Sequence, residues 1–254
     1  GTATNSGNIT NSTATDKSLI GIYADSGTTT NGGTVNLKGT EVKGIVSNGS
    51  TASTSNTGTV STNGTKAVSI AALSGTVTTT GTVNIEGTSG MGLYTGKSGT
   101  STGTINANGG SINSKNGGIN VFADRGTINL NGATINTGAN SLAFIQSSNG
   151  GIVDFKSATT ANIATDGTGF YVPPASTPTT VTYTPFTGIG SISGFNNLSN
   201  LTLNMYKNSN VAVAAYVESD LSTLTGSSIS GFNIVDKTGT HEYNDYLLYK
   251  SKLT

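Results

Sequence analysis

The eleven residues GTINLNGATIN, at positions 126–136, hold only three large apolar side chains, Ile128, Leu130 and Ile135. The other residues of this stretch are Gly, Thr, Asn and Ala, which contribute little to an ordinary hydrophobic core. Near-copies of the stretch recur along the chain, as GTVNLKGTEVK (33–43), GTVNIEGTSGM (81–91) and GTINANGGSIN (103–113). The chain therefore repeats a short unit in which few residues are apolar.

The central apolar residue of this unit recurs every 22 to 26 residues, at Ile9, Val35, Val60, Val83, Ile105, Ile128 and Val153. Self-similarity with a period of about 20 to 50 residues is typical of solenoid proteins. Inside a copy, apolar and polar residues alternate, as in Val35, Asn36 and Leu37, and this period of two indicates a β-strand. No stretch of the chain holds the 3.6-residue period of an amphipathic helix, so helical repeats are excluded.

Each copy also carries a second predicted strand, at G-I-Y-A-D (21–25), G-I-V-S (44–47), G-L-Y-T (92–95), N-V-F-A-D (120–124) and G-F-Y-V (169–172). From Ile105 onward we expect a third strand between the first two, centred on Ile112, Ile135 and Ile163. Three short strands in each repeat predict an all-β fold, a right-handed, three-sided parallel β-helix. With turns of 22–26 residues, the chain of 254 residues has room for about ten turns.

A parallel β-helix explains why the core signal is so sparse. Each strand pairs with the strands of the turns above and below, so its backbone hydrogen bonds are satisfied between turns. Only the inward residue of each alternating pair must be apolar, and the outward residues stack along the axis, where amides can bond to one another. On the alignment above, one structural ladder of outward residues is expected at Asn36, Ser61, Asn84, Asn106, Asn129 and Asp154.

The prolines divide the chain. All four lie between Pro173 and Pro185, and proline cannot donate a hydrogen bond to a neighbouring strand. We therefore expect residues 173–187 to form a loop that leaves the β-helix. Residues 1–172 are predicted to form regular turns, and residues 188–254 to continue the same β-helix less regularly.

The composition excludes several classes of protein. Only 9% of residues are charged and the net charge is zero, whereas disordered chains combine low hydrophobicity with high net charge. A neutral chain also offers no electrostatic attraction to nucleic acid or to an anionic membrane. No window approaches the roughly 18 apolar residues of a membrane helix, so we expect no direct membrane insertion by this chain. Cysteine is absent, which excludes disulfides and cysteine-based metal sites.

No catalytic or cofactor-binding motif stands in its required context, and the calcium-binding nonapeptide repeat is missing. The single histidine, His241, is interpreted as a loop residue. Asp25 and Asp124 occupy the same place in their repeats but lie four turns apart, too far to act as an acid pair. We therefore expect no enzyme activity, no catalytic residues, no cofactor and no metal. The alternative is a β-helical enzyme, a lyase or hydrolase, that degrades polysaccharides.

The second strand supplies the candidate contact residues. One row, which begins with Ile22 and Ile45, continues the core, and the other row is expected to point outward. An exposed line of aromatic side chains is unusual for a solitary soluble protein, unless a flanking loop covers it. The loop at 173–187 is a second candidate, because binding residues often lie on loops held by a rigid scaffold. The candidate partner-contact residues are Tyr23, Tyr94, Phe122 and Tyr171 in the row, and Tyr183 and Phe186 in the loop.

Repeats of G-T-[VI]-N-[LI]-x-G that alternate with G-I-Y-A, without cysteine and nearly without charge, resemble the passenger regions of autotransporters (type V secretion). They are especially similar to the very large fusobacterial outer-membrane adhesins, most strongly over residues 1–172. The resemblance implies a surface-exposed segment, on the extracellular side of the bacterial outer membrane. It also implies attachment to a receptor, protein or glycan, on host cells or other bacteria. Because the chain starts without methionine and shows no cap at either end, we expect an internal fragment.

Overall fold

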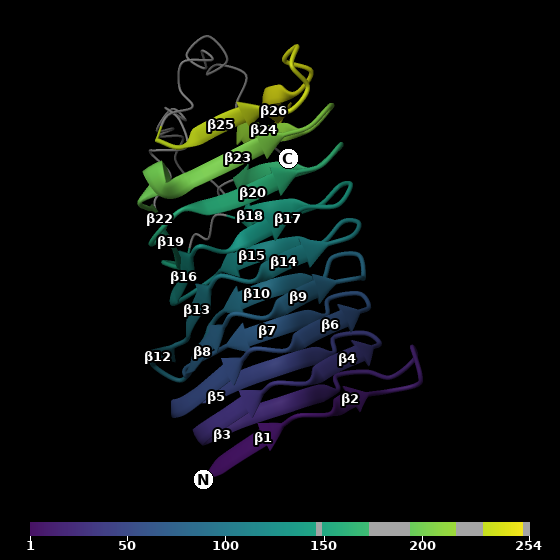
Figure 1. The fold of residues 1–254 in the computed structure, drawn as a ribbon, viewed down its shortest axis with the longest axis vertical. Coiled ribbons are helices and arrows are strands. Elements are labelled where there is room, and N and C mark those ends of the chain that lie inside the picture. Colours follow the sequence, from purple (N-terminus) through teal and green to yellow (C-terminus); the bar gives the residue numbers. More distant parts are fainter. Residues whose placement is uncertain (146–148, 173–193, 217–230, 251–254) are drawn as a thin grey trace.

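The structure, a computed structural model, describes residues 1–145, 149–172, 194–216 and 231–250. Short strands wind into a coil and stack along one axis, with the N-terminus at one end and β25 and β26 at the other (Figure 1). The only helix in the described ranges is a single 3-10 turn at Leu198–Asn200, and none there is long and apolar enough to cross a membrane. The prediction of an all-β, three-sided parallel β-helix is confirmed.

Each complete turn contributes one strand to each of three faces. The first face contains the first halves of β3 (Ile20–Asn31) and β5 (Lys43–Asn56), β7 (Val68–Ala72), β10 (Met91–Thr95), β15 (Ile119–Ala123), β18 (Leu142–Ile145), β21 (Thr168–Val172), β24 (Asn210–Tyr216) and β26 (Asn244–Lys250). The second face contains β1 (Thr2–Asn5), the second halves of β3 and β5, β8 (Thr76–Thr79), β13 (Thr104–Asn108), β16 (Thr127–Asn131), β19 (Ile152–Phe155) and β22 (Phe195–Asn196). The third face contains β2 (Asn8–Thr10), β4 (Thr34–Lys38), β6 (Thr59–Asn63), β9 (Thr82–Ile85), β14 (Ser111–Ser114), β17 (Thr134–Asn136), β20 (Thr159–Ile163), β23 (Leu201–Met205) and β25 (Asn233–Asp236).

The described strands make seven complete turns, from the turn of β3 and β4 to the turn of β21, β22 and β23, with partial turns at both ends. This is fewer than the ten or so expected, because the last turns are longer than the repeat period. Stacked Asn113 and Asn136 are 23 residues apart, but stacked Thr168 and Asn210 are 42 apart, and Asn210 and Asn244 are 34 apart.

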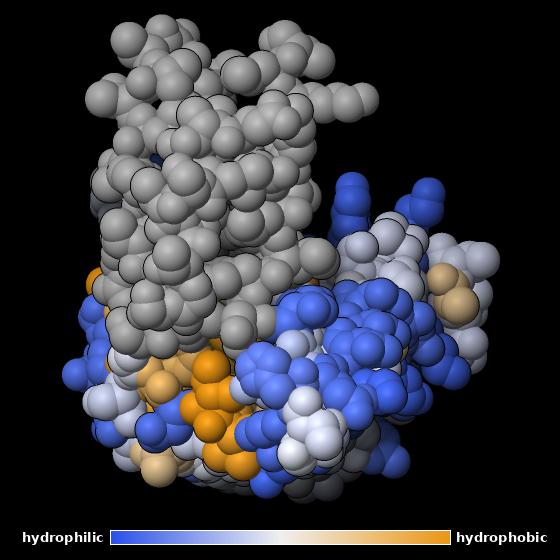
Figure 2. Space-filling view, turned by 90° about the horizontal axis from the view of Figure 1, so that it is seen from above, coloured by the Kyte–Doolittle hydropathy of each residue, from blue (hydrophilic) through white to orange (hydrophobic). Residues whose placement is uncertain are grey.

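The core runs through the coil as one continuous cluster of inward side chains. In the stretch GTINLNGATIN (126–136), Ile128 and Leu130 enter the core from β16 and Ile135 enters it from β17. All three side chains are fully buried. Viewed along the axis from the end that holds β25 and β26, the surface shows hydrophobic residues (orange) gathered beside hydrophilic ones (blue) (Figure 2). Ile128 and Leu130 thus lie on the second face and Ile135 on the third.

The core also contains polar residues whose hydrogen bonds are met inside it. The buried side chain of Asn120 donates to the carbonyls of Ile112 (2.8 Å) and Asn136 (3.1 Å), and it accepts from the Ser114 hydroxyl (2.9 Å). One turn earlier the equivalent residue is Gly92, where an added Cβ would lie 2.7 Å from the Asn120 carbonyl oxygen. The turns approach so closely here that Gly92 has no room for a side chain, while the buried Asn120 has its hydrogen bonds met internally.

Two expectations about register are wrong. The outward ladder does not pass from Asn84 to Asn106, because Asn84 pairs with Asn113 on the third face, whereas Asn106 pairs with Thr78 and Asn129 on the second. The third strand also does not begin at Ile105. A strand on the second face is present from the first complete turn, in the second halves of β3 and β5 and in β8, and it stacks on Ile105, Ile128 and Val153. Ile112 and Ile135 instead continue the third face from Val83, and the residue stacked on Ile135 is Ala161, not Ile163. These early strands are rich in Thr and Ser, so they gave no apolar signal.

Candidate functional site

The outer side of the first face carries a row of residues that we call the outer row. The backbone register stacks its members directly on one another, while the neighbouring residues Ile22, Ile45, Leu93, Val121, Phe144 and Phe170 enter the core. The members of the outer row are Tyr23, Val46, Ala71, Tyr94, Phe122, Ile145 and Tyr171.

The lower part of the outer row is covered by its own neighbours. Val46 and Ala71 are only 2% exposed and pack with Val68 in a second small cluster, against which Leu73, Met91 and Tyr94 also lie. Tyr23 stands apart on the far side of Val46. Its side chain is 53% exposed, and its hydroxyl accepts a hydrogen bond from the Asn48 amide at 2.9 Å.

The upper part of the outer row forms what we call the aromatic strip: Tyr94, Phe122, Ile145 and Tyr171, in four successive turns. Each side chain is partly exposed, and the rings of Tyr94 and Phe122 meet edge to face with centroids 5.7 Å apart. Burial raises the pKa of the Tyr94 phenol, and the charge of Asp124 raises it further, against a smaller opposing effect of Arg125. The Tyr94 hydroxyl is therefore neutral at physiological pH and can donate a hydrogen bond.

A small antiparallel hairpin, β11 (Lys97–Ser98) with β12 (Ser101–Thr102), leaves the coil directly after β10. Together with residues 125–127 and 149–152 it borders a hollow of about 420 Å³ whose lining includes Lys97 and Arg125. The carboxylate of Asp124, beside this hollow, accepts a hydrogen bond from the Asn149 amide at 2.6 Å and lies 3.9 Å from the Arg125 Nε. The end of the aromatic strip at Tyr94 is thus flanked by charged and polar groups.

The third face carries a ladder of outward amides, which we call the asparagine ladder. Each amide nitrogen donates to the side-chain oxygen of the previous turn, at 2.7 to 3.0 Å. The ladder runs through Ser61, Asn84, Asn113, Asn136, Asn162 and Asn204.

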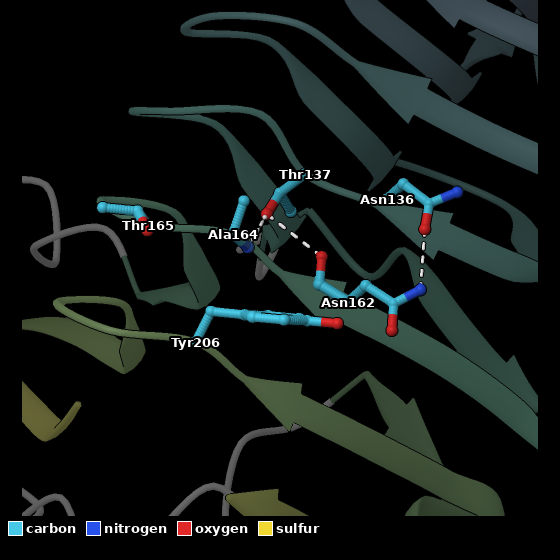
Figure 3. Close-up of a pocket in the computed structure, with 6 residues that line it drawn as sticks. All are labelled: Asn136, Thr137, Asn162, Ala164, Thr165 and Tyr206. Carbon is cyan, nitrogen blue, oxygen red and sulfur yellow. Dashed lines mark hydrogen bonds between the residues drawn. The ribbon is translucent and has the colours of Figure 1, made fainter. Parts of the chain in front are cut away.

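Beside the upper asparagine ladder lies a second hollow, of about 350 Å³, lined by Asn136, Thr137, Asn162, Ala164, Thr165 and Tyr206. Figure 3 shows the Tyr206 ring extending alongside Thr137, Ala164 and Asn162, with its hydroxyl end toward the ladder amides. The side chain of Tyr206 is 42% exposed, which makes it one of the few exposed large hydrophobic residues in the described ranges.

The acidic residues and the histidine considered as catalytic or metal-binding candidates do not form a cluster in the described ranges. Asp25 follows Ala24 and Asp124 follows Ala123, and the register sets these two positions four turns apart. Within the described ranges, no three His, Asp or Glu side chains come together as a metal site would require. His241 lies in a turn that is organised by Asp236, whose carboxylate accepts from the His241 backbone amide at 2.8 Å. Hydrogen bonds, first that of the Thr238 hydroxyl, lower the pKa of Asp236 to about 2.

Comparisons of the chain with protein-family models, with curated proteins and with solved structures found no match.

The structure brings Tyr94, Phe122 and Tyr171 into one strip and places Tyr23 separately, while Tyr183 and Phe186 lie outside the described residues. Sequence reasoning missed Tyr206 and the hairpin. A usable signal for Tyr206 was present, because it follows the strand LTLNM at the same place where Ala164 follows TTANI. Tyr206 stands where the two turns before it carry Gly138 and Ala164, and this change in size marks a departure from the repeat.

Proposed function

We propose that this chain is a structural and adhesive segment of a bacterial autotransporter passenger, exposed on the extracellular side of the outer membrane. Its partner would be a receptor, protein or glycan, on host cells or other bacteria. The proposal rests chiefly on the aromatic strip, a line of partly exposed aromatic and aliphatic side chains held at fixed spacing on a regular coil.

The coil supports the adhesive role because it is a rigid support. Strands of successive turns lie about 4.8 Å apart, so the four residues of the strip span about 14 Å along the axis. Their backbone is hydrogen-bonded to the turns on either side, so the side chains are held in place before a partner arrives. A preformed surface loses little conformational freedom on binding.

The chemistry of the strip suits a partner surface. Tyr94, Phe122 and Tyr171 are aromatic, and aromatic residues are enriched in binding interfaces, where they contribute much of the affinity. The Asp124 and Arg125 side chains lie close enough to Tyr94 to act on its phenol, and they provide a charged rim at one end of the strip. An apolar centre with a polar rim is the usual arrangement of an interface.

A binding assay tests the proposal. The 254-residue chain is labelled and its saturable binding to cultured epithelial cells and to partner bacteria is compared with that of the variant Tyr94→Ser/Phe122→Ser/Tyr171→Ser. We expect the triple variant to lose most of the binding. The control Ile20→Ser, which removes another exposed apolar side chain from the same face, should retain it.

Circular dichroism and a thermal melt establish that each variant is folded. Undiminished binding by a folded triple variant would remove the strip from the proposal. The alternative of a polysaccharide-degrading enzyme is tested separately, by measuring the release of reducing or unsaturated sugar ends from a panel of polysaccharides. Reproducible turnover there would replace the adhesive proposal.

A further inference from the structure

The hollow at Tyr206 lies where the residues stacked in successive turns change in size. After β17, β20 and β23 the chain leaves the third face at Gly138, Ala164 and Tyr206, which the register stacks on one another. Gly138 must be small, because an added Cβ would collide with the carbonyl oxygen of Lys115. The large Tyr206 ring and the small Ala164 of the turn before it border the space of about 350 Å³, which is open at the surface.

The backbone holds the Tyr206 ring over this space. The Tyr206 backbone amide donates to the Ile163 carbonyl at 3.2 Å, and the Tyr206 carbonyl accepts from both the backbone amide and the hydroxyl of Ser209. The phenol hydroxyl bonds to no other described residue, so both the ring face and the hydroxyl are available to a ligand.

The ladder amides beside the ring are held but not saturated. Asn162 donates one N–H to Asn136 at 2.7 Å, and its side-chain oxygen accepts one hydrogen bond from Asn204 at 2.7 Å. A primary amide has two N–H donors and an oxygen with two lone pairs. Asn136 and Asn162 each therefore keep one donor and one acceptor that no described residue uses. The free groups of Asn136 and Asn162 are one turn apart, about 4.8 Å along the axis.

The lining contains no charged side chain, which removes the basis for selecting an anion or a cation. The Thr137 hydroxyl is already committed, because it donates to the Asn162 carbonyl (3.2 Å) and accepts from the Ala164 amide (3.0 Å). The strands that border the hollow are paired on both edges, so an extended peptide cannot add to them as a strand. What remains is an aromatic face beside paired amide donors and acceptors.

We propose that this hollow binds a neutral saccharide. The apolar C–H face of a sugar ring would lie on the Tyr206 ring, and its hydroxyls would exchange hydrogen bonds with the free donors and acceptors of Asn136 and Asn162. A volume of 350 Å³ is near the lower end of ligand pockets, about 300–1,000 Å³, and suits one or two sugar units. This site is on a different face from the aromatic strip and does not depend on the adhesive role proposed for that strip.

The test uses the 254-residue chain and a stated panel: maltotriose, cellotriose, lactose and N,N′-diacetylchitobiose as neutral sugars, with trigalacturonate as an acidic one. Saturation-transfer NMR and calorimetry measure binding, and the side-chain amide resonances of Asn136 and Asn162 report where the sugar sits. We expect saturable binding of at least one neutral sugar, with shifts at both amides.

The variant Tyr206→Ser should raise the Kd at least tenfold, about 1.4 kcal/mol, while Tyr206→Phe keeps most of the affinity. The control Tyr23→Ser removes a tyrosine that is more exposed than Tyr206 and lies on another face, and it should leave the Kd within threefold. The proposal is overturned if no neutral sugar binds saturably, if only trigalacturonate binds, or if Tyr206→Ser binds as the unaltered chain does. Loss of cell binding by the strip variant with sugar binding intact separates this site from the adhesive one.

Discussion

The side-chain amide of Asn162 donates to the side-chain oxygen of Asn136, one turn earlier, across 2.7 Å. Asn136 in turn donates to Asn113, also at 2.7 Å, so each asparagine is both donor and acceptor along the axis. These bonds link turns in addition to the backbone pairing, and their loss should be measurable as a loss of stability.

Asn136→Ala removes two bonds of the asparagine ladder. We expect the free energy of unfolding to fall by about 1–2 kcal/mol, since both neighbours lose a partner. Urea titration followed by circular dichroism measures the change. The control Asn108→Ala removes one exposed and longer bond, 3.4 Å from Asn131, and should cost about 0.5 kcal/mol or less. Equal losses in the two variants would contradict a stabilising ladder.

Phe144 and Phe122 lie on opposite sides of the first face and offer a matched comparison. Phe144 is fully buried and its ring lies 5.3 Å from those of Phe155 and Phe170, so Phe144→Ala should cost about 3–5 kcal/mol. Phe122 is partly exposed in the aromatic strip, and Phe122→Ala should cost less than about 2 kcal/mol. Denaturant midpoints measure both, and a reversed order would mean that the inner and outer rows are assigned wrongly.

Gly92 is required by the close approach of neighbouring turns. In Gly92→Ala, the new Cβ would meet the Asn120 carbonyl oxygen and side-chain atoms of Ile85 and Ile112, all within 2.9 Å. We expect a loss of about 1–3 kcal/mol from overpacking. Gly7, where nothing lies within 4 Å of an added Cβ, is the control, and Gly7→Ala should change stability by about 0.5 kcal/mol or less. Thermal melts that show no difference between the variants would refute the steric argument.

Asp154 gives the fold a pH dependence whose sign follows from its partners. Burial acts to raise the pKa of this carboxyl, but hydrogen bonds from Lys156 and Asn197, each 2.6 Å long, outweigh it and the pKa is lowered. The folded state then binds the proton less readily than the unfolded state. The stabilisation is present above the ordinary Asp value, about 4, and is lost as the pH falls through the lowered pKa.

Asp154→Asn tests this dependence, because the variant keeps the shape of the side chain and cannot titrate. Unfolding free energies of both proteins are measured from pH 7 to pH 2. At pH 7 the unaltered chain should have a larger free energy of unfolding than Asp154→Asn. This difference should shrink as the pH falls below about 4. A difference that stays constant over this range would show that Asp154 does not contribute through its charge.

The limits of sequence reasoning are visible in the asparagines. The motif Thr-Ile-Asn occurs twice within one turn, at 127–129 and at 134–136, and the two copies lie on different faces. The sequence alignment placed Asn129, from the first copy, in one ladder with Asn84, although Asn129 lies on the second face and Asn84 on the third. The polar strands of the second face were also hidden, because Thr54 and Thr79 are buried with no apolar signal.

The sequence by itself determined the fold class and the inward residues of the typical turn, such as Ile128, Leu130 and Ile135. These follow from local alternation and from the repeat period, both of which can be read along the chain. Tertiary structure alone decided which asparagines stack, that the aromatic strip is separate from Tyr23, and that Tyr206 stands over Ala164 and Gly138. The physical reason is that stacking is set by backbone pairing between residues 23 or more positions apart, and a shift in that pairing changes every outer neighbour while it leaves the local alternation unchanged.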